Sequence, residues 1–144
     1  YLDDHSIFFF FKKNINKKPE KLSDNLYELN KSLYMQYIDF HLSWVLKINS
    51  QIANSAIEDT FLFGGHVQSQ YMINFGIPSS QINCILDNDK SKHGKRLYGT
   101  NLFVHSPTLI KDKENPIVIL RAGCFENEIS KQLYDINRNV KIIT

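Results

Sequence analysis

The chain has 144 residues, of which 42% are hydrophobic and 22% charged, as expected for a globular protein with one substantial core. The net charge of +2 is too small for the clustered basic face that nucleic-acid binding usually requires, so no nucleic-acid partner is expected. The longest apolar run, residues 7–11, is far shorter than the roughly 20 residues that span a bilayer, so no membrane association is expected either.

Residues 1–22 combine an apolar strand with a polar linker. Residues 6–11 contain four consecutive phenylalanines, which predicts a strand that is buried on both faces. A lone strand or a two-stranded hairpin cannot bury both of its faces, so this strand must belong to a larger sheet. We interpret it as the closing strand of a domain that lies upstream. The lysine-rich stretch 12–21 that follows is broken by Pro19 and is typical of a solvated linker. An exposed strand of this kind also favours pairing with a second copy of the chain.

Residues 23–56 are predicted to form a long helix that connects two domains. Apolar side chains recur at spacings of three and four across about seven turns, at 3.6 residues per turn. We expect this stripe to pack against the domain that follows, or to serve as a dimer surface. His41 lies beside it and is expected to be a packing residue at the core edge rather than a base. The stripe consists of Leu26, Leu29, Leu33, Tyr37, Phe40, Trp44, Ile48 and Ile52.

Residues 57–144 alternate between strands and helices. This alternation predicts an α/β domain with a Rossmann-like, doubly wound, mostly parallel five-stranded sheet, preceded by the long helix and the N-terminal strand. Right-handed crossovers should place the turns at Gly64 and Gly123 side by side, at the switch point of the strand order, where such sheets bind ligands. The expected strands are 60–63, 83–86, 102–104, 116–120 and 140–143, and the expected helices are 66–75, a short one from 106, and 126–137.

The first turn of this domain has a broken nucleotide-binding fingerprint. Gly64 follows an apolar strand and Gly65 comes next, but His66 and Ser69 occupy the positions where the second and third glycines of a dinucleotide loop would stand. His66 adds bulk where a pyrophosphate needs close approach. Its imidazole is a possible donor to a sugar or phosphate oxygen, and the alternative is that it caps or packs at the turn. Asp87 ends the second strand, at the position of an acid that binds ribose hydroxyls, although strand ends are commonly acidic. Asn88 and Asp89, which follow it, are possible turn formers.

The turn after the fourth strand, Gly123-Cys124-Phe125, is the second candidate ligand contact. Gly123 permits close approach of the backbone, and a helix follows. Both cysteines, Cys84 and Cys124, have apolar neighbours and are expected to be buried thiols in a reducing, cytoplasmic compartment, so packing is favoured over a nucleophilic role for Cys124. Arg121 could pair with a phosphate or with an acid of a neighbouring domain, and simple pairing at the surface is favoured. No cysteine or histidine spacing typical of a metal site is present.

A basic loop, residues 92–101, contains Gly94 and Gly99 and joins the second and third strands. It is either a lid over an anionic ligand or a simple connector, and the connector is favoured.

Several of these motifs occur in an order that is similar to one known family. The motifs are Leu62-Phe63-Gly64-Gly65-His66, Leu86-Asp87-Asn88-Asp89, the stretch from Gly94 to Asn101, Ser106-Pro107 and Ile119-Leu120-Arg121-Ala122-Gly123. Together they resemble the C-terminal, Rossmann-like domain of sugar C-methyltransferases and related class I S-adenosylmethionine-dependent (SAM-dependent) methyltransferases. The first residues resemble the final strand of the methyltransferase domain that precedes it in that family.

The resemblance implies that two domains bind the two reactants separately. SAM would bind in the upstream methyltransferase domain, which is the expected partner, and no cofactor is expected in this chain. The organisation would be residues 1–22 as closing strand and linker, 23–56 as connecting helix and 57–144 as the C-terminal domain. That domain would help to bind the substrate, possibly a nucleotide-linked sugar, with no catalytic residue of its own. The expected substrate-binding residues are Gly64, Gly65, His66, Ser69, Asp87, Gly123, Cys124 and Phe125.

Two alternatives remain open from the sequence. The chain could be a stand-alone binding module for a nucleotide or nucleotide sugar, or a vestigial domain kept for structure or dimerisation. A dehydrogenase is least favoured, because the glycine loop is interrupted.

Overall fold

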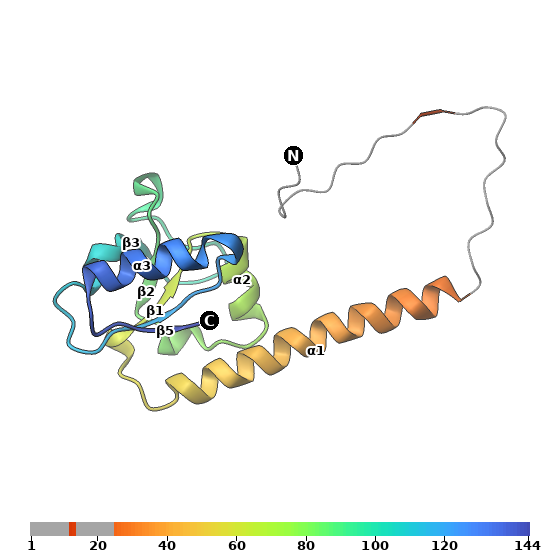
Figure 1. Cartoon of the computed structure of the whole chain (residues 1–144), viewed down its shortest axis with the longest axis horizontal. Coiled ribbons are helices and arrows are strands. Elements are labelled where there is room, and N and C mark those ends of the chain that lie inside the picture. The colour runs from red at the N-terminus through yellow and green to blue at the C-terminus, as the bar shows by residue number, and fades with distance from the viewer. Residues whose placement is uncertain (1–11, 14–24) are drawn as a thin grey trace. The chain divides into compact units, whose positions relative to one another are not determined.

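The computed structural model of the chain describes residues 12–13 and 25–144, and the predicted N-terminal strand lies outside them. The chain divides into two units, residues 1–34 and 35–144, and the boundary lies within its long helix. The helices are α1 (Leu26–Ile52), α2 (Val67–Asn74) and α3 (Glu126–Ile136), and the strands are β1 (Thr60–Phe63), β2 (Cys84–Leu86), β3 (Val104–His105), β4 (Ile117–Ile119) and β5 (Lys141–Ile143) (Figure 1).

The second unit is built on a five-stranded, entirely parallel sheet with the strand order β3-β2-β1-β4-β5. β1 lies at the centre, between β2 and β4, and the strand order reverses at the β1–β4 pair. The predicted Rossmann-like fold is therefore confirmed. The turns that follow β1 and β4 lie at the same carboxyl edge of the sheet, next to the point where the order reverses.

Both faces of the sheet are buried, as parallel sheets require. One face is covered by the last turns of α1 together with α2, through Ile48 and Met72. The opposite face is covered by α3, through Leu133, and by the short 3₁₀ turn η4 (Pro107–Ile110). Asn137 ends α3, and its buried amide donates to the carbonyl oxygens of Ile110 and Lys113 at 2.7 and 2.8 Å. This amide joins α3 to the loop that precedes β4.

α1 packs into this core only through its last three turns. Trp44, Val45, Ile48 and Ile52 are buried, whereas Tyr37 and Phe40 in the same unit are each about half exposed. The prediction that the whole apolar stripe packs against the following domain is therefore wrong for Tyr37 and Phe40. Both residues precede Trp44, the first buried residue of α1, so the helix contacts the sheet only from about Trp44 onward.

Two further features of α1 follow from this arrangement. His41 is half-buried and stacks on Phe75, with ring centroids 5.1 Å apart, which confirms its packing role. Of the helices that the structure describes, none combines the length and the apolar character needed to cross a membrane.

The loop between β2 and β3 connects the two strands through an antiparallel hairpin. The chain from Gly94 to Leu97 runs antiparallel to Leu102–Val104, with hydrogen bonds of 2.8 to 2.9 Å between Gly94, Lys95 or Leu97 and the returning strand. Residues 94–104 therefore form a hairpin that borders β3, here called the edge hairpin, with its tip at Tyr98–Asn101. This hairpin shields the outer edge of β3, which would otherwise expose unpaired backbone groups.

Candidate functional site at the carboxyl edge of the sheet

The glycine turn, Gly64–His66, connects β1 to α2. Gly64 is buried and has a φ of +105°, a conformation that side-chain-bearing residues rarely adopt. Its N–H donates to the carbonyl of Leu86 at 2.7 Å, which extends the β1–β2 ladder by one bond. A Cβ added to Gly65 would lie 3.1 Å from Val104 and 3.2 Å from the Asp87 carboxylate, so this residue must also be small.

The imidazole of His66 covers Gly64. A Cβ built on Gly64 would collide with the His66 ring, so the ring occupies the space that a ligand would use to approach this glycine. His66 is the N-cap of α2, and its Nδ1 accepts a hydrogen bond from the Gln68 N–H at 3.1 Å. Partial burial and then the nearby Lys92 lower the pKa of His66, against a weaker opposite effect of Asp87. His66 is therefore the N-cap of α2, and its lowered pKa favours the neutral imidazole.

Asp87 fastens the glycine turn from the end of β2. Its Oδ2 accepts from the Gly65 N–H at 2.7 Å and from Lys92 Nζ at 3.0 Å, and its Oδ1 accepts from the Asp89 N–H at 2.8 Å. Burial raises the pKa of Asp87, but these hydrogen bonds outweigh it and hold the pKa below its ordinary value. The Asp87 carboxylate was the predicted ribose-binding group. It already accepts hydrogen bonds from three donors within the chain.

The Asp87 contacts predict a pH-dependent stability. Because the folded-state pKa is lowered, this stabilisation is complete above the ordinary carboxyl pKa of about 4 and is lost as the pH falls through the folded pKa. Asp87→Asn should lower the free energy of unfolding by about 1.5–3 kcal/mol at pH 7. Urea unfolding at several pH values should find that the difference from the unmodified chain narrows below pH 4. A difference that is independent of pH would contradict the role of the charge.

Ser69, in α2, stabilises the glycine turn through a buried hydrogen bond. The residue is completely buried, and its Oγ donates to the Gly64 carbonyl at 2.5 Å and lies 3.4 Å from the Phe63 carbonyl. Ser69 stands where a dinucleotide loop has its third glycine, and here its hydroxyl ties α2 to the end of β1. It acts on the turn rather than facing solvent.

The second turn, η5 (Gly123–Phe125), follows β4 at the same edge. Gly123 has a φ of +56°, and the side chain of Glu126 accepts from the Ala122 N–H at 3.2 Å. Gly123, Cys124 and Phe125 are all exposed, with 54% of Phe125 accessible. The expectation of a buried Cys124 is therefore wrong, because this turn projects beyond the strand end. Cys84 is buried as expected, and burial raises its pKa to about 11.

Arg121 lies between the second turn and α1. Its guanidinium lies 5.1 Å from the Trp44 ring centroid and 6.0 Å from that of Phe40. Sequence spacing could not indicate this cation–π contact, because 77 positions separate Arg121 from Trp44.

Lys92 was not predicted from the sequence to be the partner of Asp87. The only signal was a basic residue five positions after an acid, which occurs too commonly to single out this pair.

The carboxyl edge therefore carries two glycine-containing turns with different properties. The glycine turn is closed by His66, Asp87 and Ser69, whereas η5 exposes a backbone and an aromatic ring. Among the described residues, no cluster of three or more His, Cys, Asp or Glu side chains has a metal-binding arrangement. Of the predicted site residues, Gly64, Ser69 and Asp87 are buried, whereas His66, Gly123, Cys124 and Phe125 are exposed.

Comparison with known proteins gives one result on family membership. No curated protein and no solved structure gave a significant match. The family described as the C-methyltransferase C-terminal domain matches residues 47–144, which is more than half of the chain and includes the whole sheet, both turns and the last turns of α1 from residue 47. The strand order, the two turns and this match agree with one another, and the chain belongs to the C-methyltransferase C-terminal domain family.

Proposed function

We propose that this chain supplies the substrate-side domain of a SAM-dependent C-methyltransferase that acts on a nucleotide-linked sugar. In this proposal the methyl donor binds in a methyltransferase domain that precedes these residues, and the carboxyl edge described above contributes to the substrate cleft. The family match supports the C-methyltransferase assignment. The proposal that this edge binds substrate, and not SAM, rests on the contrast between the closed glycine turn and the exposed η5 turn.

The described residues do not fit SAM at the glycine turn. A nucleoside-containing cofactor in a Rossmann fold needs backbone approach at the glycines and a carboxylate for the ribose. Here the His66 imidazole covers Gly64, and the Asp87 carboxylate is engaged by Gly65 and Lys92. No step of methyl transfer is therefore assigned to this chain.

The proposed substrate contacts are the outer surfaces of the two turns. His66 and Gly123 are both exposed, so the imidazole and the backbone of the second turn are accessible to a ligand. The exposed ring of Phe125 is suited to stacking on a nucleobase. Asp87 and Ser69 hold the turn in place, and Cys124 lies between Gly123 and Phe125 on the exposed side.

Binding of UDP-glucose to the 144-residue chain, measured by calorimetry, tests this proposal. UDP-glucose serves as a probe for a nucleoside diphosphate sugar. Phe125→Ala should weaken binding about three- to tenfold, because one stacking contact is worth about 0.5–1.5 kcal/mol. His66→Ala should also weaken binding.

The matched control is Phe103→Ala. Phe103 is exposed to a similar extent, 50% against 54% for Phe125, but lies on the edge hairpin away from both turns. It should leave the affinity unchanged. Equal effects of Phe125→Ala and Phe103→Ala, or no binding at millimolar UDP-glucose, would overturn the proposed substrate surface.

A further inference from the structure

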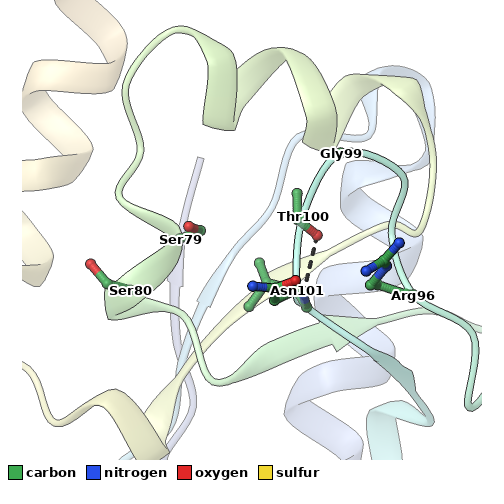
Figure 2. A pocket seen from close by; sticks show the side chains of 7 residues that line it. Ser79, Ser80, Arg96, Gly99, Thr100 and Asn101 are labelled. Carbon is green, nitrogen blue, oxygen red and sulfur yellow. Dashed lines mark hydrogen bonds between the residues drawn. The ribbon is translucent and has the colours of Figure 1, made fainter.

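A polar pocket lies away from the two turns. It has a volume of about 580 Å³ and is lined by the 3₁₀ turn η2 (Ser79–Gln81) on one side and by the edge hairpin on the other (Figure 2). η2 precedes β2 and the hairpin tip precedes β3, so the pocket lies at the amino edge of the sheet. The turns after β1 and β4 lie at the opposite edge. The lining residues are Ser79, Ser80, Arg96, Gly99, Thr100, Asn101 and Leu102.

The lining chemistry favours a hydroxylated anion. Ser79, Ser80 and Asn101 offer two hydroxyls and one amide, and Leu102 is the single large apolar side chain in the wall. Arg96 supplies the positive charge, no carboxylate lines the pocket, and no ion pair joins Arg96 to another described residue. An unpaired guanidinium can bind a phosphate with two parallel hydrogen bonds, and hydroxyl and amide groups match the hydroxyls of a sugar.

The walls of the pocket are held in position without a ligand. Thr100 Oγ1 donates to the Leu97 carbonyl at 2.9 Å and accepts from the Leu102 N–H at 3.1 Å, which fixes the hairpin tip. Gly99 has a φ of +77°, and a Cβ placed on it would meet nothing within 4 Å, so the tip leaves open space. The volume falls within the range of about 300–1,000 Å³ that is usual for small-molecule sites.

We infer that this pocket is a second binding site, for a phosphorylated sugar, with Arg96 contacting the phosphate. The inference is independent of the proposed function, because none of its residues belongs to the carboxyl edge. It gives the domain two ligand sites on opposite edges of one sheet.

Titration of the 144-residue chain with glucose 6-phosphate, followed by amide chemical shifts, tests the inference. Shifts should concentrate at residues 79–80 and 96–102. Arg96→Gln should weaken binding about tenfold, as expected when hydrogen bonds to a charged group are lost. Arg96 is exposed, so the variant is expected to fold, and its unperturbed amide spectrum outside the pocket verifies this.

Lys95→Gln is the matched control. It removes the same charge from the neighbouring position of the hairpin, yet Lys95 does not line the pocket, so it should change the affinity less than twofold. If the two variants weaken glucose 6-phosphate binding equally, the loss of affinity reflects only the net charge of the hairpin, and the proposed site is overturned. The inference is also overturned if inorganic phosphate binds as tightly as glucose 6-phosphate, or if shifts appear only at residues 64–66 and 123–125.

Discussion

Replacing Ile48 by alanine is expected to destabilise the domain by about 2–5 kcal/mol, because truncation of a fully buried aliphatic side chain leaves a cavity. Ile48 lies in α1 and packs in the cluster that includes Leu62 of β1. The free energy of unfolding from urea denaturation measures the effect. The expected loss is a large fraction of the 5–15 kcal/mol that stabilises an ordinary domain.

Leu46→Ala is the control for this substitution. Leu46 lies two residues earlier in the same helix and is 68% exposed, so its truncation should change the stability by less than about 0.5 kcal/mol. Equal effects at the two positions would mean that α1 does not pack on the sheet as described. Trp44 and Val45 are buried in the same cluster but precede the first residue of the family match, so the folded unit extends beyond the matched residues.

Gly64→Ala is expected to destabilise the chain by about 2–4 kcal/mol, from backbone strain and from loss of the His66 cap. The added Cβ would meet the His66 ring, and the φ of +105° is unfavourable for alanine. Gly99→Ala is the matched control, because Gly99 also has a positive φ, of +77°, but has open space around it. It should cost about 1–2 kcal/mol from the backbone alone.

A double variant separates the two contributions at Gly64. If the collision with the imidazole matters, Gly64→Ala combined with His66→Ala should be less destabilised than the sum of the single variants. Strict additivity, together with equal effects of Gly64→Ala and Gly99→Ala, would contradict the close contact between Gly64 and His66.

The sequence was sufficient for the elements whose patterns are local. β1 and β4 are apolar, partly β-branched runs, and α3 has apolar residues at helical spacing, so each was predicted to within one or two residues at most of its boundaries. Pro107 at the first position of η4 likewise matches its prediction. The alternation of strands and helices then predicted the fold, because parallel strands leave few possible topologies.

The sequence was insufficient where contacts join distant segments. The apolar periodicity of α1 continues through Tyr37 and Phe40, and nothing local indicates that burial starts only near Trp44. The amide of Asn137 anchors a loop more than 20 positions away, and the pocket unites Ser79 with a hairpin tip about 20 positions later. Such contacts depend on how β2 and β3 pair, which no motif in the chain specifies.

The candidate site illustrates both cases. The departure from the glycine pattern at His66 and Ser69 correctly indicated an altered turn. It could not indicate that the imidazole would cover Gly64, or that Asp87 would bond to the Gly65 N–H. Those contacts depend on side-chain conformations at the ends of two paired strands.

Mapping the amide chemical-shift changes of the 144-residue chain, with SAM and with UDP-glucose in parallel, tests the central claim most directly. The closed glycine turn and exposed η5 turn predict that UDP-glucose shifts residues 64–66 and 123–125, whereas SAM leaves Gly64 and Gly65 unchanged. Saturable shifts of Gly64 and Gly65 with SAM, and none with UDP-glucose, would contradict the account and place the methyl donor on this chain.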